Sequence, residues 1–239
     1  MTTGRVRYSA RTHVGLKRPV NEDSILALPD EELWLVSDGM GGHDAGDYAS
    51  RLIADLVATI EPGLLPSDRM HALRALIQKA HGIIQETAVE RGVETIGATV
   101  VSLMLADGHF VALWAGDSRL YRLRDGAIQM LSRDHSLVAE LVEAGHISWD
   151  EAERLPQSNA ITRAVGVGDE LVLDKVRGDA QPGDRFLLCS DGLTKYATFA
   201  MLEKVLREAP IETISDRLVQ IALDGGGADN ISVIVVDIG

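Results

Sequence analysis

The sequence has one cysteine and too few basic residues to balance its acidic ones. Cys189 is the only cysteine among 239 residues, which excludes an internal disulfide and a cysteine-rich zinc site. Lysine and arginine number 23 against 36 aspartates and glutamates, so the formal net charge is −13. An acidic surface of this kind argues against sequence-independent nucleic-acid binding and against docking on anionic membranes.

Long apolar runs, internal repeats and low-complexity segments are also missing. No stretch approaches the roughly 18 apolar residues of a membrane span, and no apolar segment near the start suggests a secretory signal. Hydrophobic residues make up 46% and charged residues 25%, which is typical of a globular protein. We therefore expect one domain over residues 1–239, placed in the cytoplasm because a reducing compartment suits a chain with a single cysteine.

Short apolar runs separated by turn signals predict strands. Asp107-Gly108 and Asp125-Gly126 each join two such runs, which is a strong hairpin signal. Two successive hairpins favour an antiparallel sheet over a doubly wound parallel one. The expected strands are 33–37, 97–106, 109–116, 119–124, 127–131, 185–190 and 231–238.

Helices are expected where apolar residues recur at helical spacing, in 49–60, 70–84 and 211–221. The strands are almost continuously apolar, so both faces of each sheet should be covered. The fold class expected is therefore α/β of the α+β type. Two mostly antiparallel sheets pack face to face with helices on both outer sides, as a four-layer α-β-β-α sandwich.

Four aspartates fall at the ends of expected strands, which is the most informative pattern in the chain. Asp38, Asp117 and Asp191 directly follow apolar runs, and Asp229 precedes the last one by two residues. If these side chains converge, like charges would raise their pKa values unless a cation is present. Oxygen ligands favour Mg²⁺ or Mn²⁺. The plainer alternative is that aspartate and glycine only form turns there.

Eight short motifs in order give the chain a recognisable resemblance. The chain resembles the metal-dependent serine/threonine protein phosphatases, the protein phosphatase 2C-like (PPM) family, in its compact bacterial single-domain form. The resemblance runs from about residue 10 to residue 236. The motifs are RPVNEDS (18–24), VSDGMGGH (36–43), GATVV (97–101), AGDSRLY (115–121), RDHS (133–136), AITRAVG (160–166), GDRFLLCSDGL (183–193) and GADNISVIVV (227–236).

The resemblance implies a centre of two Mn²⁺ or Mg²⁺ ions. Asp38 would bridge the ions, the carbonyl of Gly39 would bind one of them, and Asp191 and Asp229 would bind the other. A water activated by both ions would then attack the phosphorus of phosphoserine or phosphothreonine in line.

Three further residues are carried over from the NED motif and its neighbourhood. Glu22 and Asp23 would order metal-bound waters. Arg18 lies four residues before Glu22 and would hold the phosphate, because a guanidinium can donate to two oxygens at once.

Lys195 departs from the pattern. Relatives place an acidic residue four positions after Asp191, where with Asp117 it helps to hold a third, weaker ion. A lysine cannot ligate and would repel that ion. Either the third site is weak or empty, or Asp117 holds water or pairs with Lys195.

The general acid stays open. Some relatives have a histidine two residues after the bridging aspartate, where this chain has Met40. His43 is the nearby candidate, although it could equally be a polar residue at a helix start, and a metal-bound water could serve instead. Cys189 lies in an apolar run and is expected in the core rather than as a catalytic thiol.

Two other classes of protein are alternatives to the phosphatase interpretation. A metal-dependent nuclease would need catalytic histidines and a basic path. A non-catalytic phosphoprotein-binding module would be expected to lack metal aspartates. The resemblance implies phosphoprotein partners, including targets of a serine/threonine kinase, with the kinase itself as a further candidate, and the acidic charge argues against nucleic acid and membrane partners. A monomer is expected, with a flap over about 137–160 as a candidate for substrate selection.

Overall fold

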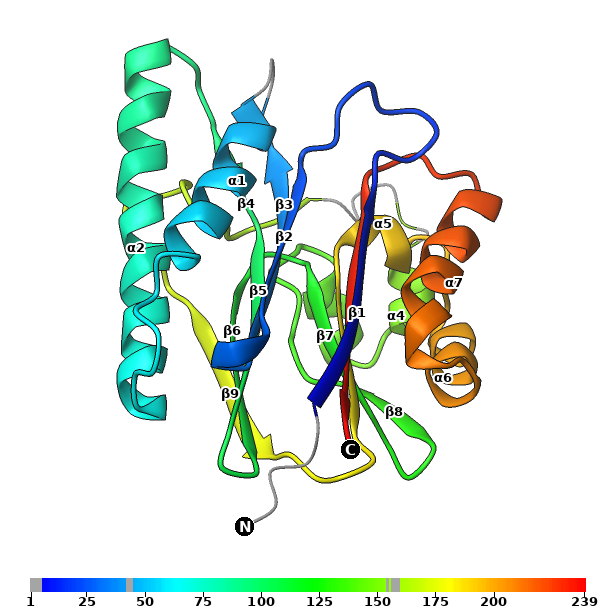
Figure 1. Cartoon of the computed structure of the whole chain (residues 1–239). Coiled ribbons are helices and arrows are strands. Elements are labelled where there is room, and N and C mark those ends of the chain that lie inside the picture. The colour runs from blue at the N-terminus through cyan, green and yellow to red at the C-terminus, as the bar shows by residue number, and fades with distance from the viewer. Residues whose placement is uncertain (1–5, 42–44, 154, 156–159) are drawn as a thin grey trace.

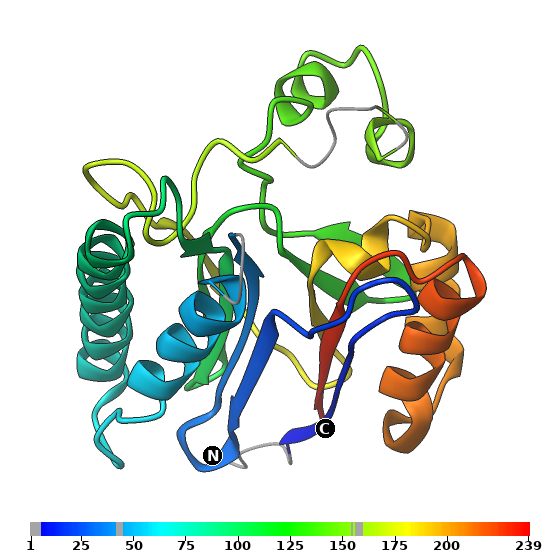
Figure 2. The ribbon, with the colours of Figure 1, turned by 90° about the horizontal axis from the view of Figure 1, so that it is seen from above.

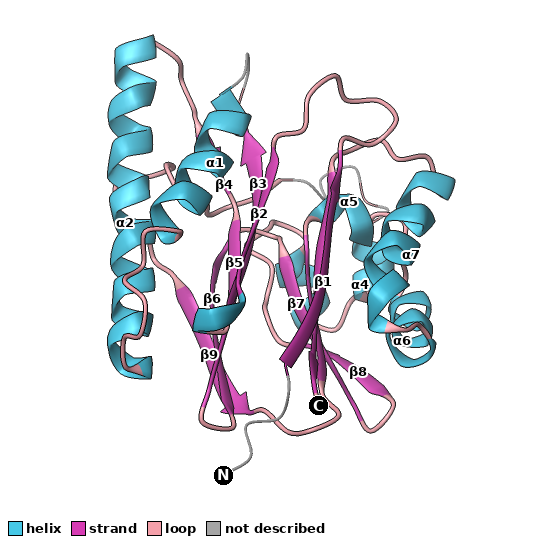
Figure 3. Cartoon of the chain, in the orientation of Figure 1, coloured by secondary structure: helices cyan, strands magenta, loops and turns pink. Residues whose placement is uncertain are grey.

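The computed structural model describes residues 6–41, 45–153, 155 and 160–239. Its strands form two sheets that pack face to face, and helices cover the outer side of each sheet (Figures 1 and 3). All neighbouring strands of both sheets pair antiparallel. The layered antiparallel sandwich predicted from the sequence is confirmed.

The first sheet has the first and last strands of the chain as neighbours. Its strands are, in spatial order, β1 (Val6–His13), β11 (Ile231–Ile238), β10 (Arg185–Cys189), β7 (Arg119–Arg124) and β8 (Ala127–Met130). Asp125 and Gly126 join β7 to β8 with φ angles of 51° and 80°, as a two-residue hairpin requires.

The second sheet carries the other predicted hairpin. Its strands are β2 (Asp23–Leu28), β3 (Leu33–Met40), β5 (Val100–Ala106), β6 (His109–Ala115) and β9 (Asp174–Asp179), with the short β4 (Gly97–Ala98) paired to β3. Asp107 and Gly108 join β5 to β6 with φ angles of 49° and 73°. The segment predicted as one strand over 97–106 forms two strands, β4 and β5, which Thr99 separates.

The helices cover the outer face of each sheet. The second sheet is covered by α1 (Ala45–Val57) and α2 (Pro66–Arg91), and η1 (Pro29–Glu31) precedes β3. The first sheet is covered by α5 (Asp191–Thr194), α6 (Phe199–Glu208) and α7 (Ile211–Asp224). Two short helices, α3 (Ala139–Glu143) and α4 (Trp149–Ala152), stand away from the sandwich in Figure 2. None of the helices in the described ranges is long and apolar enough to span a bilayer.

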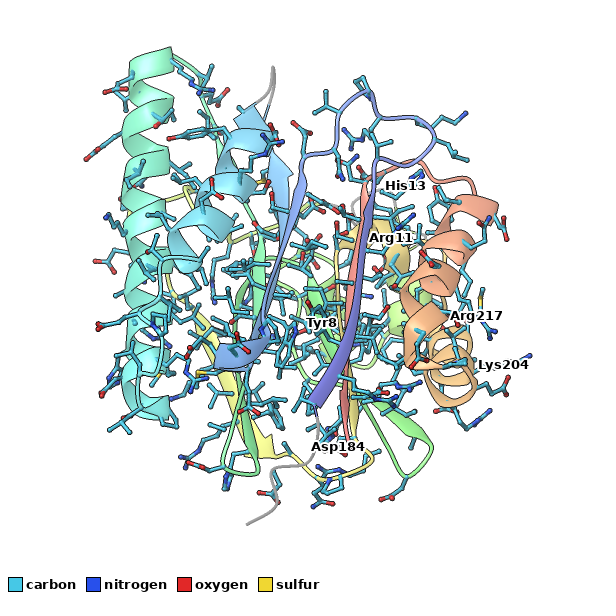
Figure 4. The ribbon with its side chains drawn as sticks, in the orientation of Figure 1. Tyr8, Arg11, His13, Asp184, Lys204 and Arg217 are labelled. Atoms are coloured by element: carbon cyan, nitrogen blue, oxygen red, sulfur yellow. The ribbon has the colours of Figure 1, made fainter. Side chains whose placement is uncertain are left out.

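Large apolar side chains fill the space between the sheets (Figure 4). Trp34 of β3 and Phe186 of β10 are fully buried there, and Phe186 lies 5.2 Å from the ring of Phe110. Burying each such side chain contributes roughly 1.5–3 kcal/mol. Cys189 is also fully buried, on the face of the first sheet that packs against the helices, which confirms it as a core residue. Both sheets are thus rigid supports for the residues at their ends.

Candidate metal centre

The four aspartates meet in one cavity at the end of the sandwich that carries loop 14–22, the upper part of Figure 1. They reach it from different elements: the end of β3, the turn after β6, the start of α5 and the turn before β11. The residues that line the cavity are Arg18, Glu22, Asp38, Gly39, Met40, Gly41, Thr99, Asp117, Ile161, Asp191, Lys195, Asp229 and Asn230.

Two hydrogen bonds with Thr99 fix the backbone of Asp38. The backbone N–H of Thr99 donates to the Asp38 carbonyl at 2.8 Å, and the Asp38 N–H donates to Thr99 Oγ1 at 3.0 Å. Thr99 makes these bonds where the predicted strand is divided, and sequence analysis assigned it no role. Burial, together with repulsion from Asp23, Asp191, Asp117 and Asp229, raises the pKa of Asp38 well above its usual range.

Gly39 is required by the close approach of α1. A Cβ atom at this position would lie 2.1 Å from the carbonyl oxygen of Gly46 and 2.6 Å from that of Glu22. The Gly39 N–H donates to the Glu22 carbonyl at 3.1 Å, which also fixes the strand against the NED segment. Glycine here lets the end of β3 lie against the backbone of Gly46 and Glu22, directly after Asp38.

Asp229 and Asp191 are held by cationic side chains. Arg18 Nε and Nη2 lie 2.9 and 3.1 Å from the two carboxylate oxygens of Asp229. Lys195 Nζ lies 2.8 Å from Asp229 Oδ2 and 2.8 Å from Asp191 Oδ2. Burial acts to raise the pKa of Asp229, but the hydrogen bonds and charges of Lys195 and Arg18 outweigh it and lower that pKa. Asp117 is the partner considered for Lys195 from the sequence, whereas the structure pairs Lys195 with Asp191 and Asp229.

Asp117 lies deeper in the same cavity and is 8% exposed. Burial and the neighbouring Asp191 raise its pKa well above the usual range. The preceding Gly116 has a φ of 110°, and a Cβ there would lie 2.6 Å from the side chain of Thr99. This glycine turns the chain sharply after β6 and aims Asp117 at the cavity.

Glu22 and Asp23 occupy different positions. Glu22 lines the cavity, whereas Asp23 lies behind Asp38, with which it pairs in register across β2 and β3. Asp23 is 6% exposed, and its Oδ2 accepts a hydrogen bond from Ser190 Oγ at 2.8 Å. Burial raises its pKa to about 7. Asp23 therefore supports the strand end, while Glu22 can reach groups in the cavity.

Asn230 is a site residue that sequence analysis quoted within a motif without giving it a role. It is 4% exposed, and its side-chain amide bonds to three backbone groups of residues 14–22. His43 lies outside the described residues, so its role stays a prediction. Met40, the alternative position for a histidine, lines the cavity.

The flap predicted over about 137–160 contains α3 and α4 in its described part. It is anchored by the buried guanidinium of Arg119, which pairs with Asp134 at 2.6 Å and with Glu153 at 2.7 Å. The same guanidinium lies 4.9 Å from the ring centre of Trp149. None of these residues was predicted as an anchor, because a sequence does not say which charges meet.

The donor set fits hard divalent cations. Asp191 Oδ1 is buried without a hydrogen-bond partner among the described residues, so an acceptor is left free in the cavity. No three acidic, histidine or cysteine side chains of the described chain are spaced as a complete ligand set for one ion. Mg²⁺ needs only one or two carboxylates and keeps several waters, so carboxylates in pairs with the Gly39 carbonyl are a suitable set. Asp38, Asp191 and Asp229 are the residues placed to provide it.

Almost the whole chain matches known proteins. The family model described as Protein phosphatase 2C matches residues 16–226. The serine/threonine protein phosphatase PstP of Mycobacterium tuberculosis is 35% identical over 234 residues, which is 98% of this chain and 45% of the relative. The chain thus spans about half the length of that curated relative.

Two solved structures are also similar. The structure of PppA, a key regulatory component of T6SS in Pseudomonas aeruginosa, gives a TM-score of 0.91 at 40% identity and covers 99% of both chains. The catalytic domain of serine threonine protein phosphatase PstP, in complex with two manganese ions, gives a TM-score of 0.84 at 34% identity and covers 98% of both chains.

Proposed function

The chain belongs to the protein phosphatase 2C family, and from this premise we propose that it hydrolyses phosphoserine and phosphothreonine in proteins at a centre of two Mn²⁺ or Mg²⁺ ions. One observation carries the proposal. Asp38, Asp191 and Asp229 reach one cavity from three separate elements, and the orphaned oxygen Asp191 Oδ1 is among them. Turn formation alone gives no reason for carboxylates to converge from elements so far apart in sequence.

The residues that would hold the ions are Asp38, Asp191 and Asp229 through their carboxylates and Gly39 through its backbone carbonyl. Bound ions would supply a nucleophilic water of lowered pKa and would neutralise charge on the phosphoryl oxygens. The part of the protein is to fix these oxygens, as Thr99 does for Asp38. Glu22, on the cavity wall, is proposed to orient waters, with Asp23 supporting the strand behind it.

Arg18 is proposed to bind the phosphoryl group of the substrate. Its side chain is 49% exposed at the cavity mouth, so an incoming anion can reach it. The Nε and Nη2 atoms of its guanidinium both donate to Asp229. A phosphate offers the same pair of oxygens, so exchange of one bidentate partner for the other needs little rearrangement. His43 is kept as a candidate proton donor to the leaving serine or threonine oxygen.

The test is phosphate release from a phosphothreonine peptide in EDTA, Mg²⁺ and Mn²⁺. Wild type should be inactive in EDTA and active with metal. Asp38→Asn should fall to the EDTA level, because the amide keeps the shape but removes the charge that the ions need. Asp30→Asn, at an exposed acid on η1, is the matched control and should behave as wild type. Folding of each variant is checked by circular dichroism.

A folded wild type that releases no phosphate with either metal would refute hydrolysis. If it then retained a phosphothreonine peptide in a binding assay, the non-catalytic phosphoprotein-binding module would replace the enzyme. Activity of Asp38→Asn equal to wild type would refute the proposed ligand set while leaving hydrolysis in place.

Partners and location are part of the same proposal. We propose that the substrates are targets of a serine/threonine kinase, including the kinase itself, that the domain acts as a monomer, and that it works in the cytoplasm. The relatives named serine/threonine protein phosphatase support the substrate class. The single, buried Cys189 suits a reducing compartment.

A further inference from the structure

Lys195 places a positive charge inside the carboxylate cluster. Its Nζ lies 2.8 Å from Asp191 Oδ2 and 2.8 Å from Asp229 Oδ2, and its side chain is 16% exposed. Asp191 is the first residue of α5 and Lys195 follows directly after that helix, so four-residue spacing puts both on one face. The second partner comes from the turn before β11, so the ammonium ties two separate elements together.

This arrangement differs from an ordinary surface ion pair. A lysine exposed to water gains little from a single carboxylate, whereas Lys195 is largely removed from solvent and faces two. The cavity wall carries five carboxylates, those of Glu22, Asp38, Asp117, Asp191 and Asp229, against the cations Arg18 and Lys195. Without Lys195, the described lining of the cavity would hold one cation, Arg18, beside five acidic groups.

The position of the ammonium also matters for ions. Asp229 Oδ2 and Asp191 Oδ2 are oxygens that the proposed centre needs for its second ion, and Lys195 contacts both. Any ion that binds these oxygens must displace the ammonium or accept its repulsion. A further ion near Asp117 and Asp191 would meet the same charge at close range.

We propose that Lys195 is a resident cation of the centre, which holds Asp191 and Asp229 together in the metal-free protein, competes with divalent ions for their oxygens and takes the place of a third ion. The inference rests on the proposed metal-dependent function and adds to it a residue that sets metal affinity and number. Lys195 would repel a third ion because its ion pairs with Asp191 and Asp229 hold the ammonium inside the cavity.

The test compares Lys195→Met with wild type and with Lys204→Met. Methionine keeps an unbranched chain without the charge. Lys204 projects outward from α6, away from the cavity, and serves as the matched control (Figure 4). Two quantities are measured: the melting temperature in EDTA, and the affinity and number of bound Mn²⁺ ions by isothermal titration calorimetry.

Lys195→Met should melt at a lower temperature than wild type in EDTA and bind Mn²⁺ about tenfold more tightly or better, because a nearby positive charge has been removed. Lys195→Arg should keep the wild-type affinity within a few fold. Lys195→Asp, which adds a carboxylate beside Asp117 and Asp191, should raise the number of bound ions from two to three. Lys204→Met should change none of these quantities.

Equal Mn²⁺ affinity in Lys195→Met and wild type would overturn the inference, whatever the activities. So would a third Mn²⁺ ion on wild type. If wild type binds no Mn²⁺ at all, the proposed function fails first. If wild type binds two ions and hydrolyses the peptide while Lys195→Met matches it in every measurement, only the role of Lys195 fails. Should Lys195→Met prove unfolded in EDTA, Lys195→Arg and Lys195→Asp still decide between the outcomes, since both are titrated in the presence of Mn²⁺.

Discussion

The side-chain amide of Asn230 donates a hydrogen bond to the backbone carbonyl of Val20 at 3.0 Å and so holds the segment that carries Arg18. The same Nδ2 donates to the Val14 carbonyl at 2.9 Å, and Oδ1 accepts from the Glu22 N–H at 2.8 Å. One buried side chain therefore clamps both ends of the loop around Arg18. Asn230 directly follows Asp229, so the loop that carries Arg18 and a proposed metal ligand share one support.

Asn230→Asp should weaken phosphate binding without removing metal binding. The substitution keeps the shape but replaces the NH2 group, which donates both bonds, with one oxygen that faces the same two carbonyls. We expect a rise in KM for a phosphothreonine peptide, and in the inhibition constant of inorganic phosphate, of about ten- to a hundredfold. Gln129→Glu, an exposed amide on β8, is the control for the added charge. If KM stays at the wild-type value while kcat falls, the clamp does not act through the loop.

Arg18→Ala gives the second measurement on this loop. Loss of the bidentate guanidinium should lower kcat/KM by about a hundredfold, and Arg18→Lys should restore only part of it. In the double variant with Asn230→Asp the two losses should not add, because Asn230 acts by placing Arg18. Additive losses in steady-state kinetics would mean that the two residues act independently.

Asp38, Asp117 and Asp191 stand out in the sequence because each follows an apolar run. Their convergence depends on strand direction, which the sequence does not give: β3 and β6 both pair antiparallel with β5, so their ends meet at the same rim. Arg18 and Glu22 were predicted as site residues from the family motif RPVNEDS (18–24). Thr99 and Asn230 were not identified, because their roles depend on which backbone groups face them after folding. The Lys195 departure was visible, but its partners depend on a contact between α5 and the turn before β11.

The strands missed by sequence analysis share a physical reason. β1, β2 and β9 lie at sheet edges and have few fully buried positions, so they lack the apolar runs that mark the central strands. The flap predicted over about 137–160 was not predicted to contain two separate helices, α3 and α4. Gly145, at a φ of 72°, ends the first, and Ser148 with Glu151 forms a capping box that starts the second.

The ion pair between Arg119 and Glu153 should fix the flap to the sandwich. Both side chains are largely buried, with 6% and 12% exposed, and the distance is 2.7 Å. Glu153→Gln leaves the guanidinium paired with Asp134 alone, so the cost should be smaller than the roughly 3–5 kcal/mol of leaving a buried charge without a partner. We expect a lower melting temperature and faster amide hydrogen exchange in α3 and α4.

Glu143→Gln is the matched control for the flap. Glu143 lies in α3 and pairs with Arg133, but both side chains are more than a third exposed, so its loss should cost about 1 kcal/mol or less. Equal hydrogen exchange of α4 in Glu153→Gln and wild type would show that the flap is held by other contacts. A change in KM for a phosphoprotein without one for a small aryl phosphate would link flap position to substrate selection.

His81 gives a pH dependence that is separate from the metal centre. It is 5% exposed in α2, and its Nδ1 accepts a hydrogen bond from the Gly166 N–H at 2.9 Å, which only the neutral ring can do. Burial lowers the pKa of His81 below the ordinary value of 6.5, so the folded protein binds a proton less readily than the unfolded chain. Its contribution to stability is therefore complete above about pH 6.5 and is lost as the pH falls below that value.

His81→Asn should flatten this part of the pH profile. Asparagine offers an oxygen near the position of Nδ1 and does not titrate, so the free energy of unfolding should depend less on pH below about 6.5 than in wild type. His71→Asn, at an exposed histidine of the same helix, is the control and should keep the wild-type slope. Urea unfolding at several pH values measures the difference. If the free energy of unfolding depends on pH equally in His81→Asn and wild type, the ring can be protonated in the fold without loss of stability. The hydrogen bond from Gly166 would then not be needed to hold the 160–166 segment against α2.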